Sequence, residues 1–314
     1  MAKTQSTSAG APPPERRLPA TFRPRRGVGI ALGAAAALWS FALAGLLLSR
    51  GLTQEVSLSA FGCHLLAAVF FALGCLFAYW TFACATLRYE VDRNGLTIHW
   101  GFVRQVVPLD KIEKLETAYS EAVPRLEGLD WPGHQVGRGH VERFGSILFY
   151  ATHRNPEELV YVVTAQQTYA VSAPERREFV AEVEARRKEG PGIALRQRPR
   201  RSFLIAQPIW GDRLAHALAL AAIAVWAATL GLVFARYPGL PDSLAMSFPP
   251  LEVTRVASKS EVLSLPSTAF GVLAVNLVLA FAFHAWERIV SHLLLVALVG
   301  LQTVFLVGAA IAVS

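Results

Sequence analysis

The sequence predicts an α-helical, multi-pass membrane protein with about five transmembrane helices and an inserted α+β domain. Of its 314 residues, 53% are hydrophobic and 17% are charged, and the mean hydropathy is +0.38. The apolar residues are concentrated in long stretches, whereas the region between the second and third stretches shows the alternating pattern of strands. This composition excludes a disordered polymer, a fibrous protein and a disulfide-rich secreted miniprotein.

Each apolar stretch can cross the hydrocarbon core of a bilayer, which needs about 20 residues of helix. Their interiors lack Asp, Glu, Lys and Arg, which argues against a pump or a proton-coupled transporter. Ala42-Leu43-Ala44 resembles a signal-peptide cleavage site, but the apolar run continues beyond it and favours an anchor. The expected spans are residues 27–49, 60–87, 214–235, 268–286 and 289–313.

The basic residues predict the orientation of these spans. Most of the 30 lysines and arginines lie in residues 1–26, in residues 88–213 or at Arg288. By the positive-inside rule this side is the cytoplasm. We therefore expect a plasma- or inner-membrane protein with a disordered basic cytoplasmic tail over residues 1–26, and with its C-terminus outside. The opposite side holds only Arg50, Arg236, Arg255 and Lys259.

Residues 88–190 are predicted to form one cytoplasmic domain. Asn94-Gly95 between two alternating runs is the strongest short signal of a β-hairpin. Ser172 and Glu175 form a capping box that predicts a helix ending near Glu189, with Phe179 and Val183 on its apolar face. Seven short strands are expected at about residues 87–92, 96–100, 103–109, 111–117, 146–152, 159–164 and 168–171.

A set of turn and core residues within roughly residues 85–188 carries a family resemblance. They are Tyr89, Val91, Asn94-Gly95-Leu96, Ile98, Trp100-Gly101, Val107-Pro108-Leu109, Ile112, Pro132-Gly133, Gly137, Phe144-Gly145 and Phe149-Tyr150-Ala151-Thr152. With the order of seven strands and one helix, they resemble the bacterial pleckstrin-homology (PH) family found in multi-span membrane proteins. The resemblance implies a seven-stranded, partly open barrel capped by a C-terminal helix.

Basic residues gather at the end of the predicted helix and in a polybasic linker over residues 191–213. Such clusters attract anionic lipid headgroups, although the positive-inside rule explains the cluster equally as a topology anchor. The first hairpin turn supplies only Arg93 and Arg88, which argues against recognition of an inositol lipid. The near balance of charge in the domain argues against nucleic acid as a partner. The candidate lipid contacts are Arg186, Arg187, Lys188, Arg196, Arg198, Arg200 and Arg201.

The sequence contains no motif for catalysis. It has no P-loop, nucleophile elbow, H-E-x-x-H motif or paired carboxylates, so we expect no catalytic residue, cofactor or metal. His134 and His140 are assigned to a solvated loop over residues 118–142, and with His153 they lack the supporting ligands of a metal site. The histidines near span ends are expected to need no ligand; they are His64, His216, His284 and His292.

Two amides lie near the middle of the last two spans. In an antiparallel hairpin, Asn276 and Gln302 would reach the same depth and could bond to each other across the helices. A polar lining for a permeating solute is the alternative interpretation of this pair.

The external loop over residues 236–267 carries a second resemblance. Tyr237-Pro-Gly-Leu-Pro-Asp242, Ser247-Phe248 and Ser258-Lys259 lie within residues 214–285. They resemble an uncharacterised bacterial membrane module that also occurs in toxin-immunity membrane proteins. Ser247 stands where that module usually has histidine.

These observations favour a non-enzymatic integral membrane protein that presents a PH-like domain for protein–protein or anionic-lipid interaction, in a scaffolding or regulatory role. Its protein partner would be another protein or a second copy of the chain. The alternative is a membrane sensor or toxin-immunity protein that recognises an extracellular ligand through the external loop. A small-solute transporter fits the uncharged spans least well.

Overall fold

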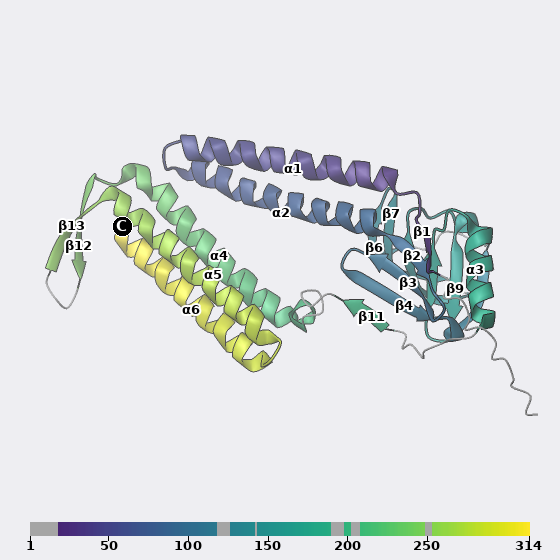
Figure 1. The fold of residues 1–314 in the computed structure, drawn as a ribbon. Coiled ribbons are helices and arrows are strands. Elements are labelled where there is room, and N and C mark those ends of the chain that lie inside the picture. Colours follow the sequence, from purple (N-terminus) through teal and green to yellow (C-terminus); the bar gives the residue numbers. More distant parts are fainter. Residues whose placement is uncertain (1–17, 118–125, 142, 190–197, 202–207, 249–252) are drawn as a thin grey trace, which may run out of the picture. The chain divides into compact units, whose positions relative to one another are not determined.

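The structure is a computed structural model that describes residues 18–117, 126–141, 143–189, 198–201, 208–248 and 253–314 (Figure 1). The chain divides into two compact units. The strand-rich unit comprises Met1–Ile30 and Ala83–Arg200, and the helical unit comprises Ala31–Phe82 and Arg201–Ser314.

The expected spans are all helices, and each is long and apolar enough to cross a membrane. They begin and end within a few residues of the predicted limits, since long uncharged runs determine helix length more strongly than local caps do. The helices are α1 (Gly27–Thr53), α2 (Leu58–Thr86), α4 (Arg213–Arg236), α5 (Ser264–His284) and α6 (Arg288–Ala312).

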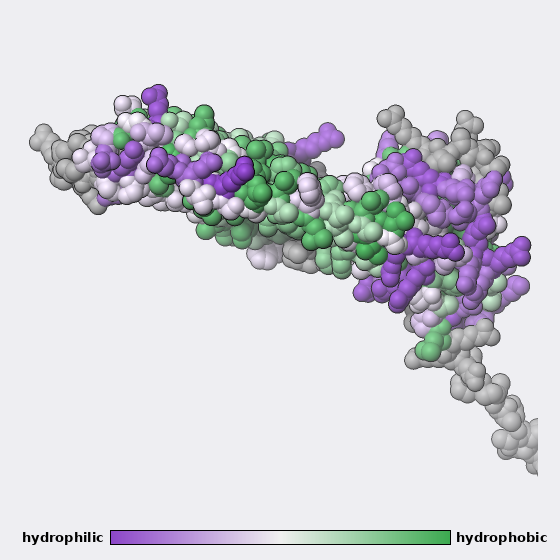
Figure 2. Space-filling view, turned by 90° about the horizontal axis from the view of Figure 1, so that it is seen from above, coloured by the Kyte–Doolittle hydropathy of each residue, from purple (hydrophilic) through white to green (hydrophobic). Residues whose placement is uncertain are grey.

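Large apolar side chains cover the outside of these helices. For example, Trp39, Val278 and Val304 are 70%, 67% and 69% exposed, respectively. Figure 2 shows hydrophobic residues gathered over the helices and hydrophilic residues over the strand-rich unit. Soluble proteins rarely expose apolar patches of this extent, so the surface is compatible with a membrane location.

In the helical unit, α4, α5 and α6 pack around small and branched residues. Ala222, Ala280 and Leu298 are fully buried at their contacts. Alanines let the helix backbones approach closely, which is the packing that membrane helices favour. Within the predicted external loop, β12 (Ser243–Phe248) and β13 (Val253–Ser258) pair as an antiparallel hairpin, so this connection is more ordered than a loop.

Among its described residues, the strand-rich unit contains each of the seven expected strands and four others. Sheet order is β1-β2-β3-β4-β11 in the first sheet and β5-β9-β10-β8-β7-β6 in the second, and they do not join into a closed barrel. The strands of the first sheet are β1 (Ala20–Phe22), β2 (Arg88–Val91), β3 (Gly95–Trp100), β4 (Val103–Pro108) and β11 (Arg198–Arg201). Those of the second are β5 (Ile112–Thr117), β6 (Glu127–Trp131), β7 (His134–Val141), β8 (Gly145–Ala151), β9 (Val160–Thr164) and β10 (Thr168–Val171).

Three of the additional strands correct the predicted boundaries of the domain. β1 lies in the segment predicted to be a disordered tail, and its residues pair with β2 in antiparallel register. β6 and β7 form a hairpin in the segment assigned to a solvated loop. β1 has only three residues, and glycines and charges interrupt the alternation of β6 and β7. The strand pattern of both segments is therefore visible only once the partner strand is known.

Both sheets contribute to one apolar core, which α3 (Arg176–Glu189) helps to bury through Phe179 and Val183 as predicted. Tyr89 crosses this core: its hydroxyl donates to the Tyr150 carbonyl at 2.7 Å and accepts from the Ser172 amide at 3.1 Å. Burial raises the pKa of Tyr89 to about 12. Ser172 therefore links the sheets, and the predicted capping role for it is wrong because its hydroxyl bonds to Tyr89 and Thr152.

Candidate functional site

The PH-like region is fastened to the ends of α1 and α2 by contacts within the strand-rich unit. The Arg26 guanidinium, just before α1, donates to the carbonyls of Ala85 and Leu87 at the end of α2. The Gly101 amide, in the β3–β4 turn, donates to the Thr86 hydroxyl at 2.8 Å. These bonds hold the turn against the last residue of α2, where a predicted membrane span ends.

An exposed aromatic ring and exposed arginines lie next to these contacts in the chain. Phe102 follows Gly101 in the β3–β4 turn and is 50% exposed. Arg104 follows on β4, and Arg23 and Arg25 precede α1; all three are exposed. Arginine side chains favour the boundary between membrane and water, where the apolar stem is buried and the guanidinium is hydrated. An exposed phenylalanine ring beside them can enter the apolar side of that boundary.

The first hairpin turn of the domain is organised by an acidic residue. Asp92 Oδ1 accepts from the amides of Asn94 and Gly95, both at 2.7 Å. Arg88, the other basic residue near this turn, forms an ion pair with Glu90, with 2.7 Å between Arg88 Nε and Glu90 Oε1. The turn thus presents no cluster of bases for an inositol phosphate.

The seven predicted lipid contacts are not equivalent. Arg186 is buried, with its guanidinium donating to Glu182 at 2.5 Å and to the Leu18 carbonyl at 2.7 Å, so its assignment as a lipid contact is wrong. Arg187 and Lys188 are exposed at the end of α3. Arg198, Arg200 and Arg201 belong to β11, at the edge of the first sheet, and Arg196 lies outside the described residues. Helical spacing placed Arg186 on the same face as Phe179 and Val183, which is the signal that could have separated it from its neighbours.

The predicted amide pair does not form. Asn276 Nδ2 donates to the Val272 carbonyl of its own helix at 2.9 Å. Gln302 Nε2 crosses from α6 to α5 instead, and donates to the Ala269 carbonyl at 2.9 Å. The interhelical bond exists, but its acceptor is a backbone group, because Gln302 lies nearer to Ala269 than the symmetric hairpin places it.

The structure separates the histidines of the predicted loop. His134 is buried at the start of β7, where its Nε2 accepts from Trp100 Nε1 at 2.7 Å. Burial lowers the pKa of His134 to about 4. His140 is exposed on β7, and His153 faces Glu158 with an Nε2–Oε2 distance of 3.7 Å. They do not converge on one point.

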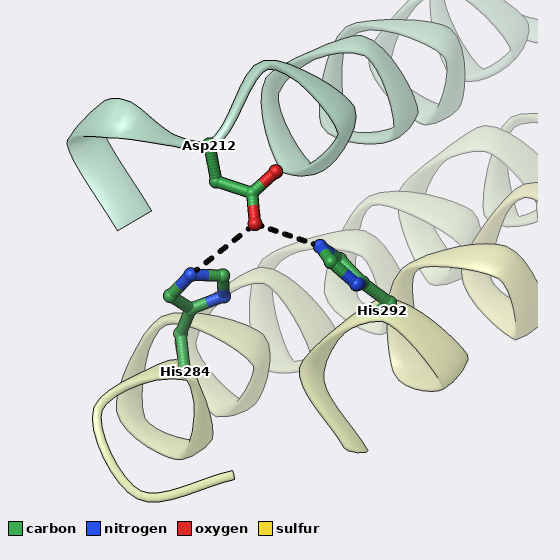
Figure 3. A group of neighbouring side chains, drawn as sticks. All are labelled: Asp212, His284 and His292. Atoms are coloured by element: carbon green, nitrogen blue, oxygen red, sulfur yellow. Dashed lines mark hydrogen bonds and ion pairs between the residues drawn. The ribbon is translucent and has the colours of Figure 1, made fainter. Parts of the chain in front are cut away.

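Three other residues do converge, at the ends of α4, α5 and α6 (Figure 3). Asp212 precedes α4, His284 ends α5, and His292 lies in the second turn of α6. Asp212 Oδ2 is 2.9 Å from His292 Nε2 and 3.6 Å from His284 Nε2. A hydrogen bond from Arg288 holds the pKa of the Asp212 carboxyl below its ordinary range.

Sequence reasoning missed this cluster because no short spacing joins its members. Its signal was topological: the start of the third span, the end of the fourth and the start of the fifth were all assigned to the cytoplasmic side. Polar residues at those three positions are therefore expected at one level of the bundle.

Residues 87–187 match the family model described as a bacterial PH domain. Neither a comparison with curated proteins nor one with solved structures gives a match. PH domains commonly bind lipids or proteins, and the match suggests an interaction of one of these kinds for this part of the chain. The resemblance of residues 214–285 to the toxin-immunity module has no support from these comparisons.

Proposed function

We propose that this chain is a non-enzymatic, inner-membrane protein whose PH-like domain is held at the cytoplasmic membrane surface to contact anionic lipid. The match to the bacterial PH family and the five apolar helices support the general class. The observation that carries the proposal is the fastening of the β3–β4 turn to the end of α2 through Gly101 and Thr86. Phe102 and Arg104 follow Gly101 closely in the chain, which supports a position for both near the end of the proposed span.

The lipid contacts proposed here differ from those that the sequence indicated. The junction residues Arg25, Phe102 and Arg104 replace Arg186, whose guanidinium is committed to Glu182 and Leu18. Arg187, Lys188 and the linker arginines remain additional candidates. Each exposed base near an anionic surface contributes about 1 kcal/mol, so several weak contacts would orient the domain. A scaffolding or regulatory role follows from this placement, with a partner protein bound on the surface that faces away from lipid.

Amide hydrogen exchange of the full chain in nanodiscs tests the lipid contact. Phosphatidylglycerol, compared with phosphatidylcholine alone, should slow exchange at residues 101–104 by about five-fold, which corresponds to about 1 kcal/mol. The double variant Arg25→Ser with Arg104→Ser should lose this difference. Arg143→Ser, which removes an exposed arginine from the β7–β8 turn, should retain it. Equal exchange in both lipids would contradict the proposed contact.

The orientation makes a separate prediction. Reporter domains fused after Arg201 and after Ser260 should give cytoplasmic and external signals respectively, because most basic residues lie on the first side. A fusion after Thr53, in the α1–α2 connection, should match the external one. The reverse pattern would overturn the topology and with it the access of the PH-like domain to the cytoplasmic leaflet.

A further inference from the structure

Asp212, His284 and His292, which we call the helix-end triad, place one carboxylate and two imidazoles around a common point. Their ligand atoms all lie within 4.8 Å of one another. The side chains of Asp212 and His284 are only 3% and 1% exposed, and that of His292 is 20% exposed. Each residue comes from a different helix end, so the triad exists only in the packed bundle.

A serine determines the tautomer of His284. Ser291 Oγ has a single proton, which it donates to the Ala280 carbonyl at 2.9 Å. The same oxygen lies 3.1 Å from His284 Nδ1 and must therefore accept from it. In the neutral ring, Nε2 then carries a lone pair, and it faces Asp212 Oδ2 at 3.6 Å. Two electron-rich atoms aimed at each other in a buried place are unfavourable unless positive charge lies between them, which a metal ion or a proton on Nε2 can supply.

The carboxylate is oriented in a similar way. Asp212 Oδ1 accepts from the amides of Leu214 and Ala215, at 3.0 and 3.1 Å, and caps α4. Oδ2 is thereby turned toward both imidazoles (Figure 3). Metal-binding histidines and carboxylates in proteins are held by outer hydrogen bonds of this kind, which fix the tautomer and the orientation of the ligand.

Arg288 is a charged group at the triad. Its Nε donates to Asp212 Oδ2 at 2.6 Å, but its side chain is 66% exposed and can swing into solvent. Among the residues that the structure describes, His216, in the first turn of α4, also interacts electrostatically with His284. Arg288 therefore competes for the carboxylate oxygen, whereas His216 adds a further nitrogen near the same helix ends.

We propose that the helix-end triad binds a divalent transition-metal ion, with zinc as the best fit. A tetrahedral zinc ion with bonds of 2.0–2.2 Å separates neighbouring ligand atoms by about 3.3–3.6 Å. The distance from Asp212 Oδ2 to His284 Nε2, 3.6 Å, matches this separation, and the distance to His292 Nε2, 2.9 Å, would need to lengthen slightly. Two imidazoles disfavour magnesium and calcium, which select oxygen ligands. Three protein ligands leave a fourth position for water or another ligand. The ion would tie together the ends of α4, α5 and α6.

Metal binding by the full chain in detergent tests this site, with any affinity tag removed and with bound metal stripped by a chelator. Incubation with Zn²⁺ or Co²⁺ should restore about one ion per chain, and Co²⁺ should show the visible absorption of a tetrahedral site. His284→Ala and His292→Ala should weaken binding by at least about 100-fold. His64→Ala, a histidine of α2 outside the triad, should leave binding unchanged.

Two variants keep the test valid if the alanine variants fail to fold. Asp212→Asn retains an N-cap for α4 but removes the anionic ligand, so binding should weaken and the Co²⁺ spectrum should change. Arg288→Gln removes the competing guanidinium and should tighten binding by about 3- to 10-fold. Absence of stoichiometric metal, or binding that none of the triad substitutions alters, would overturn the proposal. It would leave the cluster as a set of ion pairs.

Discussion

Replacing Gly133 by alanine is expected to destabilise the junction between the β6–β7 hairpin and α1 by about 2 to 4 kcal/mol. Gly133 has φ +78°, which alanine adopts only with strain, and a Cβ there would run into the backbone of Gly29. The contact is reciprocal, because a Cβ on Gly29 would lie 2.6 Å from the Gly133 carbonyl oxygen. Neither backbone can move without disturbing the other element.

The measurement is amide hydrogen exchange at residues 134–141, which reports the local opening of β7. Gly145→Ala is the matched control: its φ of +67° imposes similar backbone strain, but no atom lies within 4 Å of the added Cβ. It should cost only about 1 kcal/mol. Equal effects of the two substitutions would show that the approach of Gly29 and Gly133 contributes nothing to stability.

Acidification is expected to destabilise the same hairpin through His134. Burial lowers the pKa of His134 to about 4 in the folded state. The neutral ring also accepts a hydrogen bond from Trp100. In the unfolded chain, His134 has the ordinary histidine pKa of about 6.5. Between about pH 4 and pH 6.5 the unfolded chain therefore binds a proton that the folded chain does not. The stabilisation is therefore present above pH 6.5 and is lost as the pH falls towards 4. The loss amounts to about 2 to 3 kcal/mol.

A pH series of exchange rates at β7, in the full chain, measures this loss. His134→Gln should flatten the dependence between pH 6.5 and 4, since an amide oxygen can accept from Trp100 without titrating. His140→Gln, on the exposed side of the same strand, should retain the dependence. A profile that is unchanged by His134→Gln would assign the pH sensitivity to other groups.

Periodicity and charge predicted a large part of the fold. The five uncharged runs became the five long helices, and the alternating runs from Arg88 to Val171 became strands, because both patterns act over short distances along the chain. The β6–β7 hairpin escaped prediction, since Gly128, Gly133, Gly137 and Gly139 break its apolar alternation. Its stability depends on β8 and on the close approach of Gly29.

The candidate sites show the same division between what sequence patterns predict and what only the folded structure shows. Basic composition indicated seven lipid contacts, but Arg186 pairs with Glu182 and with the Leu18 carbonyl, 168 residues away in the chain. The triad of Asp212, His284 and His292 has no spacing signature, since its members are brought together by helix packing. Gln302 behaved in part as predicted, because a buried amide in a membrane helix requires a partner but accepts any suitable one.

The sequence by itself determined which segments are long apolar helices, where the alternating domain lies between them, and which segments carry the positive charge. These properties depend on residues that are close together in the sequence, so they can be predicted without knowing any contact between distant residues. Only the tertiary structure decided which bases are exposed, which glycines meet, and which histidines face a carboxylate. Each of these properties depends on contacts between groups far apart in the chain. One additional Cβ, or the position of one proton, is enough to prevent or allow such a contact.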